Sequence, residues 1–326
     1  MIKIGVIGTG AIVPFHIDAL RASGFQLDTL VFNTNLDRAK MLQETFGFKS
    51  LTNNFLDLQS AQLDCFLVAT SAFSIETVLN KLWKFELPIL VEKPVTINTG
   101  FFDKIPETSR EKTQVAYNRR FYSSVRTFKE QLNNVSEVGF RINVPENSWN
   151  ESMSPQKFIE NLKINTVHVI DLMFFLFGAD LMLNYVQVFE TTSTLLSINC
   201  HLSNSKYSGT LSITNGVPDT YSVSAFCAGL KLELQPLEMF SSADKMRVVQ
   251  PTLESPIRRY MPLSESNWEI AKEDLEFKPG FYFQAQAFKS LCESGKLTPE
   301  SATLTHAAQV IAFCDEISKY IESKLS

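Results

Sequence analysis

Short runs of apolar and β-branched residues recur along the first third of the chain, and segments with helical spacing separate them. The apolar runs have strand length and cover residues 2–7, 27–32, 64–70, 88–93 and 113–118. The segments with helical spacing cover residues 11–23, 35–47, 74–84 and 98–104. This alternation predicts right-handed βαβ crossovers and a parallel sheet with helices on both faces. Ligands of such sheets bind beyond the carboxyl ends of the strands, so the loops after the strands are the places to search for chemistry.

Length and charge restrict the class of protein. A chain of 326 residues is long for one hydrophobic core, so we expect two domains. The formal net charge of −5 gives no basic field that would favour nucleic acid or an anionic membrane surface. The apolar stretch at 169–183 is interrupted by Asp171 and Asp180, so we expect no membrane span. The first residues have the pattern of a strand and not that of a signal peptide.

The cysteines indicate the compartment. They stand at scattered positions, mostly among apolar residues, and no two of them form a C-x-x-C pair. The five are Cys65, Cys200, Cys227, Cys292 and Cys314. This pattern predicts reduced core cysteines in a cytoplasmic protein, with no disulfide framework and no metal site.

The loop after the first strand has the pattern of a dinucleotide-binding turn. It lies between a strand and a helix, which is the context that this fingerprint requires. The predicted pyrophosphate contacts are Gly8, Thr9, Gly10, Ala11 and Ile12. Gly8 permits the tight turn, and Gly10 lets a pyrophosphate approach the helix N-terminus, where free N–H groups favour anions. Val13 stands at the third glycine position, and an ordinary tight turn between strand and helix is the alternative interpretation.

The loop after the second strand should meet the adenosine ribose. NAD-specific sites usually carry an acidic residue here, but this chain has Asn33. The next residue, Thr34, is not the arginine that would favour a 2′-phosphate, although Arg38 lies one helical turn further on. The expected cofactor is therefore NAD or NADP. Asn33 and Asn35 would serve equally well as a helix N-cap and a turn residue.

Further motifs follow the later strands and continue to the end of the chain. They are residues 69–71 (ATS), 91–95 (VEKPV), 116–121 (AYNRRF), 168–171 (HVID) and 283–288, which begins and ends with phenylalanine. Together with the glycine turn, these motifs resemble those of the glucose–fructose oxidoreductase, inositol dehydrogenase and MocA (Gfo/Idh/MocA) family. The resemblance extends over nearly the whole chain, and Glu-Lys-Pro at a strand end is its most specific part.

The resemblance implies a fold of two parts. Residues 1–119 would form a Rossmann dinucleotide-binding domain, and residues 120–326 an α+β substrate-binding and oligomerisation domain with an open, mostly antiparallel sheet. Strand-like runs at 135–144 and 183–235 fit that sheet, and a helix at 155–177 would lie between it and the cofactor. An open sheet leaves a face to bury, so we expect a homodimer or homotetramer formed through the C-terminal sheet.

The resemblance also implies an activity. The protein would be an NAD(P)-dependent oxidoreductase that transfers a hydride between nicotinamide and a secondary alcohol or ketone of a sugar, nucleotide sugar or polyol. His168 would be the base for the hydroxyl proton, since a histidine titrates near neutral pH, and Lys93 would polarise the same oxygen. Taken alone, His168 is more simply a core histidine bonded to a backbone carbonyl, and Lys93 a surface lysine at a strand end. The combination of motifs favours the catalytic interpretation for both.

Other residues are candidates for binding. Asn165 and Asp171, on the helix that carries His168, would place the substrate. Trp149, in a polar loop, would cover a sugar ring, and Tyr260 would bind a phosphate beside two arginines; an exposed loop aromatic and a solvated strand edge are the alternatives. The remaining expected cofactor contacts are Thr70, Ser71, Glu92, Lys93, Pro94, Asn118 and Arg120. His16 is expected to pack in the core.

One departure from the family pattern motivates a competing hypothesis. Dehydrogenases of the family commonly have Asp-x-Gly-x-His, but Ile164 and Thr166 stand at the aspartate and glycine positions here. A non-catalytic sensor or corepressor that binds the cofactor on the same scaffold is therefore the alternative function. A third hypothesis is a tightly held nicotinamide that shuttles hydride between two sugars. Lys93 and His168 are both retained, and a pure sensor requires neither, so the enzyme is preferred.

Overall fold

The computed structural model describes residues 1–32, 35–146, 153–190, 195–264 and 268–325. Contacts divide the chain into two compact units. The first unit contains Met1–Tyr122, Glu160–Leu172 and Lys272–Glu316, and the second contains Ser123–Ile159, Met173–Ala271 and Ile317–Ser326. Two later segments of the chain thus group with the N-terminal residues, and one of them carries His168.

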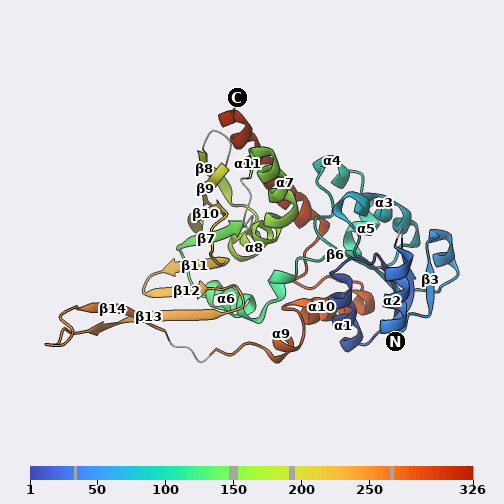
Figure 1. Ribbon diagram of the computed structural model, residues 1–326, viewed down its shortest axis with the longest axis horizontal. Coiled ribbons are helices and arrows are strands. Elements are labelled where there is room, and N and C mark those ends of the chain that lie inside the picture. Colours follow the sequence, from blue (N-terminus) through green and yellow to red (C-terminus); the bar gives the residue numbers. More distant parts are fainter. Residues whose placement is uncertain (33–34, 147–152, 191–194, 265–267, 326) are drawn as a thin grey trace. The chain divides into compact units, whose positions relative to one another are not determined.

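The first unit is built on a parallel sheet with the strand order β3-β2-β1-β4-β5-β6. Figure 1 labels its two edge strands, β3 and β6. Its strands are β1 (Ile2–Ile7), β2 (Phe25–Val31), β3 (Ser50–Thr52), β4 (Cys65–Val68), β5 (Ile89–Val91) and β6 (Thr113–Val115). All neighbouring pairs are parallel. The predicted parallel sheet is confirmed, and its order is that of a Rossmann fold. The order reverses beside β1, between β2 and β4, which is where such folds bind ligands.

Helices of the first unit cover this sheet and join its strands. They are α1 (Val13–Ala22), α2 (Leu36–Phe46), α3 (Ala72–Leu82), α4 (Thr99–Phe102), α5 (Glu107–Glu111), α9 (Lys272–Glu276) and α10 (Phe281–Ser294), with 3₁₀ segments η1 (Phe55–Gln59), η2 (Trp83–Phe85) and η3 (Asn118–Phe121). Helix α1 packs against α10, where the Phe15 and Phe281 rings meet edge to face at 6.5 Å. No side chain caps the first turn of α1, and Pro14 lies there without an N–H to satisfy.

The segment predicted as one helix at 155–177 is helical but not uniform. It consists of α7 (Pro155–Asn161), a π turn η4 (Leu162–Thr166) and α8 (Val167–Phe177). The π turn was not predicted, because its backbone hydrogen-bond pattern leaves no mark on the spacing of apolar residues. It directly precedes His168, and single π turns within helices are frequent at functional sites. The last helix is α11 (Leu304–Leu325).

The second unit contains an open sheet of order β14-β13-β12-β11-β7-β10-β9-β8. Its strands are β7 (Val138–Glu146), β8 (Met182–Glu190), β9 (Leu195–Ser203), β10 (Tyr207–Asn215), β11 (Ser222–Cys227), β12 (Leu230–Leu234), β13 (Phe240–Val249) and β14 (Arg259–Ser264), and helix α6 (Ser123–Asn133) belongs to the same unit. Only the β7–β10 pair is parallel, so the predicted mostly antiparallel sheet is confirmed.

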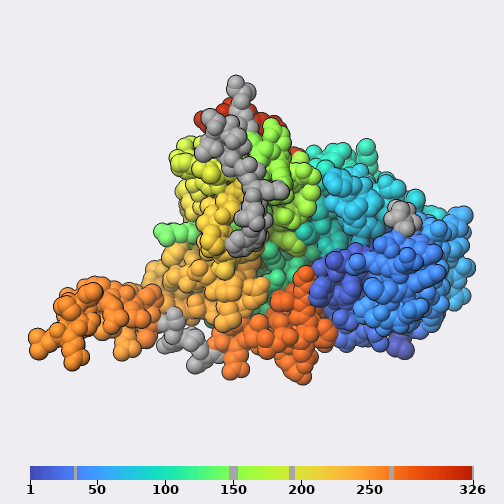
Figure 2. Space-filling model, in the orientation of Figure 1, coloured from blue at the N-terminus to red at the C-terminus, as the bar shows by residue number. Residues whose placement is uncertain are grey.

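Burial in this sheet follows the two-residue period of a strand. In β9, Ile198, Cys200 and Leu202 are buried while His201 between them is exposed. The outer half of the β13–β14 hairpin extends as a narrow arm from the strands of its own unit (orange in Figure 2). Its residues are largely exposed and lack apolar alternation, so the predicted strand region ended before it, at residue 235.

No helix within the described ranges is long and apolar enough to cross a membrane. The five cysteines are free thiols, and Cys65, Cys200 and Cys314 are buried.

Candidate active site

A first cavity of about 570 Å³ lies at the carboxyl ends of β1, β2 and β4. Gly8 has φ +118°, and a Cβ added to it would lie 2.2 Å from the carbonyl oxygen of Ala69, so only glycine fits. A Cβ on Gly10 would meet that same oxygen at an ordinary 3.8 Å. The predicted contacts that line this cavity are Gly8, Thr9, Gly10, Ile12, Thr70 and Ser71. The turn, the uncapped first turn of α1 and the cavity together fit the pyrophosphate of a dinucleotide.

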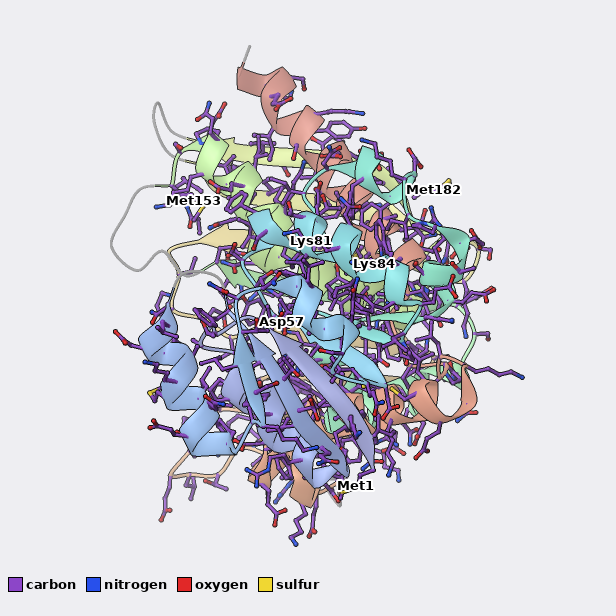
Figure 3. All side chains as sticks on the ribbon, turned by 90° about the vertical axis from the view of Figure 1, so that its right-hand side faces the viewer. Met1, Asp57, Lys81, Lys84, Met153 and Met182 are labelled. Carbon is purple, nitrogen blue, oxygen red and sulfur yellow. The ribbon has the colours of Figure 1, made fainter. Side chains whose placement is uncertain are left out.

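The first cavity continues towards α3 and η1, away from the glycine turn. Val31 and Phe32 line it from the end of β2, and Val78 and Lys81 line it from α3. The ammonium of Lys81 lies 4.7 Å from the centre of the Phe55 ring. Figure 3 labels Lys81 and shows the molecule from the side that lies at the right of Figure 1. This part of the cavity offers apolar walls and one cation to the adenosine half of a dinucleotide.

The residues predicted to meet the ribose have different positions. Asn33 and Thr34 lie outside the described residues. The Asn35 side chain accepts the backbone N–H of Arg38 at 2.9 Å and so caps α2, as its alternative interpretation had it. Arg38 is not among the residues that line the cavity. Among the described residues that line this cavity, Lys81 is the only one with a charged side chain, and none is a carboxylate.

A second cavity of about 420 Å³ adjoins the first, since Ile12 and Thr70 line both. Lys93 and His168, which are far apart in the sequence, line it together. Its other lining residues are Glu92, Asn118, Arg119, Tyr122, Lys278 and Phe281. All of these described lining residues belong to the first unit.

Lys93 is held by the backbone of the π turn. Its Nζ donates to the carbonyl oxygen of Ile164 at 3.0 Å. Ile164 stands at the position where the sequence lacks the expected carboxylate. A neutral backbone oxygen thus serves as an acceptor for Lys93 at the place where an anionic side chain was expected.

His168 has the environment of a base. Burial, first, and then the charges of Lys93, Arg119 and Lys278 lower its pKa well below its ordinary value of 6.5. The ring is therefore neutral at pH 7. Its Nδ1 is buried and has no hydrogen-bond partner among the described residues, so the alternative of a histidine bonded to a backbone carbonyl is not seen at that atom. The ring of Tyr117 meets the imidazole edge to face at 6.1 Å.

His16 is buried, as its expected packing role requires, and it also contacts Glu92. Its Nε2 lies 2.6 Å from Oε1 of Glu92, and both side chains are buried. The other Glu92 oxygen accepts the backbone N–H of Lys93 at 3.1 Å. The His16 ring also packs on Phe281, with ring centres 4.6 Å apart. His16 thus holds the carboxylate that precedes Lys93.

Asp171 and Arg120 bind each other. Nε of Arg120 donates to one carboxylate oxygen at 2.8 Å and Nη2 to the other at 2.6 Å. Both residues are buried, with 0% of Asp171 and 1% of Arg120 exposed. Burial raises the pKa of Asp171, and the Arg120 charge acts in the opposite direction. Neither residue lines the two cavities, so the geometry favours a structural tie between η3 and α8 over the ligand contacts that we expected.

The described residues among the other predicted site residues do not line either cavity. Asn165 is exposed and lines neither of them, and the same holds for Ala11. Pro94 is buried after the cis peptide bond of Lys93. Tyr260 lies on β14 in the second unit with 62% of its surface exposed. Trp149 lies outside the described residues.

The strand order, the glycine turn and the adjoining cavities define the first unit as a nucleotide-binding Rossmann fold. Residues 2–119 match the family described as "Oxidoreductase family, NAD-binding Rossmann fold" (Gfo/Idh/MocA). This match agrees with the resemblance inferred from the motifs over these residues.

Curated relatives are similar over part of their length. Glucose-6-phosphate 3-dehydrogenase of Bacillus subtilis is 26% identical over 208 residues, which is 59% of each chain. Inositol 2-dehydrogenase 1 of Paenarthrobacter aurescens is 28% identical over 189 residues, or 55% of each. The matched region therefore spans less than two thirds of these relatives.

Solved structures are similar over the whole chain. A dehydrogenase from Clostridium difficile superposes with a TM-score of 0.76 at 17% identity and covers 97% of this chain and 98% of its own. UDP-N-acetylglucosamine 3-dehydrogenase from Acidithiobacillus ferrooxidans gives a TM-score of 0.73 at 14% identity, over 100% and 99% of the two chains. At such identities the likeness establishes the fold, including that of the second unit.

Proposed function

We propose that the protein is an NAD(P)-dependent oxidoreductase that acts on a secondary alcohol or ketone of a sugar, nucleotide sugar or polyol. The observation that carries this proposal is the placement of Lys93 and His168 in one cavity beside the glycine turn. The names of its relatives agree with this class, since they are dehydrogenases of inositol and of glucose 6-phosphate.

The described residues fit the cofactor of this reaction. Gly8, Gly10 and the N-terminus of α1 would hold the pyrophosphate, because backbone N–H groups and the helix dipole favour anions there. Thr70, which lines both cavities, and Glu92 would line the nicotinamide side. When bound, the nicotinamide supplies the hydride acceptor for oxidation or the donor for reduction.

The chain's own residues would manage the proton. Neutral His168 takes the hydroxyl proton during oxidation, because its lowered pKa keeps it unprotonated at pH 7. Lys93, which donates to the Ile164 carbonyl, presents its ammonium to the substrate oxygen and stabilises the charge that develops there. His16 and Glu92 fix the backbone just before Lys93. We assign Lys93 and His168 to catalysis. Asp171 and Arg120 have a structural role, because their ion pair holds α8 against η3.

The sensor hypothesis is supported mainly by the missing carboxylate at residue 164. The Ile164 carbonyl gives Lys93 an acceptor without that carboxylate, so this support is weak. Two further proposals concern the location and the oligomeric state of the protein. One is a cytoplasmic location, which the free thiols support. The other is a homodimer or homotetramer formed through the open eight-stranded sheet.

A two-stage experiment tests the proposal. Calorimetric titration with NAD⁺, NADH, NADP⁺ and NADPH should give binding of at least one dinucleotide. Sugars, sugar phosphates, polyols and nucleotide sugars are then screened for a change in nicotinamide absorbance. Binding without turnover across the panel, together with a change in oligomeric state on ligand binding, would support the sensor. Absence of dinucleotide binding would remove both hypotheses.

A further inference from the structure

Positive charge is concentrated in the second cavity. Among its described lining residues, Lys93, Arg119 and Lys278 are cations, and Glu92 is the only carboxylate. The cations come from three separate places: the segment after β5, the 3₁₀ segment η3 and the loop before α10. The charge is therefore a property of how the first unit folds and not of one basic stretch of sequence.

The single carboxylate is engaged elsewhere. One Glu92 oxygen lies 2.6 Å from Nε2 of His16, and the other accepts the backbone N–H of Lys93 at 3.1 Å. His16 does not line the cavity, so Glu92 is drawn towards a partner outside it. Both of its oxygens thus have partners, and its one negative charge leaves an excess of positive charge from the three cations.

The three cations make the interior of the cavity electrostatically positive. Nζ of Lys278 lies 4.8 Å from the centre of the Phe15 ring and 5.5 Å from that of Phe281, two contacts that hold an ammonium against aromatic faces. The pKa of His168 is lowered by Lys93, Arg119 and Lys278, in addition to burial. The position at which a substrate proton would be taken is therefore electrostatically positive.

The phosphates of the proposed cofactor do not account for this charge, since they have a place of their own at the glycine turn of the first cavity. We infer that the substrate is an anion, a sugar or polyol that carries a carboxylate or a phosphate, with Arg119 and Lys278 binding the anionic group. This inference rests on the proposed function, because it names the class of substrate for the same site. Arginine and lysine are the usual partners of both kinds of anion.

Calorimetry with matched ligands tests the inference without requiring turnover. The probes are glucose, glucose 6-phosphate and glucuronate, each titrated into protein saturated with its dinucleotide. The charged sugars should bind at least about tenfold more tightly than glucose at low salt. Arg119→Gln and Lys278→Gln should each remove most of that preference. Lys272→Gln is the matched control, because its side chain is 79% exposed and pairs with Glu276 outside the cavity.

The outcomes separate this inference from the proposed function. Failure of wild-type protein to bind any dinucleotide counts against the proposed function. If the dinucleotide binds and the charged sugars bind no better than glucose, or none of them binds, the substrate inference is overturned. It is also overturned if both variants bind the dinucleotide more weakly but keep the preference for charged sugars, because the two charges would then bind the cofactor. Tighter binding of the phosphate or of the carboxylate identifies the anion.

Discussion

The glycine turn at residues 8–12 and the helical segment at 162–171 form the two sides of the site by opposite means. In the turn, the conformation depends on a missing side chain, because a Cβ on Gly8 would collide with the Ala69 carbonyl. In the helical segment it depends on polar groups held by distant partners, such as Asp171 by Arg120 and the Ile164 carbonyl by Lys93. Residue type alone reveals the first arrangement, whereas only the folded chain reveals the second.

The largest expected effect is on the buried ion pair of the helical segment. Arg120→Met leaves the Asp171 carboxylate buried without its partner, so the free energy of unfolding should fall by about 3–5 kcal/mol. Adding Asp171→Leu removes the stranded charge and should restore much of this loss. Urea unfolding followed by circular dichroism measures each value.

A surface pair provides the control for that experiment. Lys231 and Glu233 on β12 form an ion pair whose side chains are 35% and 26% exposed, and Lys231→Met should cost only about 0–1 kcal/mol. If Arg120→Met costs no more than this, the tie between η3 and α8 does not stabilise the segment that carries His168.

The next effect is on turnover. His168→Asn should lower kcat by a factor of about 100 or more, the usual loss when a general base is removed. Dinucleotide affinity should change little, because the residues of the glycine turn are untouched. His201→Asn, at an exposed position on β9, is the control and should retain full activity. Equal activity of the two variants would make His168 a packing residue.

The same contrast explains what the sequence reveals. Apolar runs located five of the six parallel strands. They missed β3, because Leu51 is its only apolar residue and has polar residues on both sides. Gly8 was recognised because it opens a glycine motif between a strand and a helix. His16 was taken for packing, since nothing in its neighbourhood indicates Glu92, which is 76 residues away.

Polar motifs were harder to interpret than apolar patterns. Arg120 and Asp171 belong to two motifs that were both expected to contact ligands, but they contact each other across 51 residues. The role of the Ile164 carbonyl belongs to the backbone of the π turn, and no side chain reports it. Burial and periodicity are local properties that a sequence carries, whereas the partner of a polar group is decided by the complete fold.

A smaller effect is expected in the glycine turn. Gly8→Ala forces a side chain into a φ of +118°, a strain of about 1–3 kcal/mol, and the close Ala69 oxygen adds to it. Dinucleotide affinity should also fall, because the turn must shift to make room for the added side chain. Gly47→Ala is the matched control: its φ is +75°, but nothing lies within 4 Å, so about 1 kcal/mol is expected and binding should persist. Unchanged binding in Gly8→Ala would separate the turn from the cofactor.

The smallest effect is on the pH dependence of oxidation. Burial and the charges of Lys93, Arg119 and Lys278 keep the pKa of His168 below 6.5, so the base stays neutral and the rate holds as the pH falls through 6.5. The rate should decline only when the pH reaches the lowered pKa. Lys278→Gln removes one of the three charges, so the pKa should rise and the acid limb of kcat/KM should move to higher pH, by a fraction of a unit. Lys272→Gln should leave the limb in place, because Lys272 is not among the charges that act on His168. A limb that stays fixed in Lys278→Gln, or one that follows Lys272→Gln equally, would mean that the group titrating in the rate is not His168.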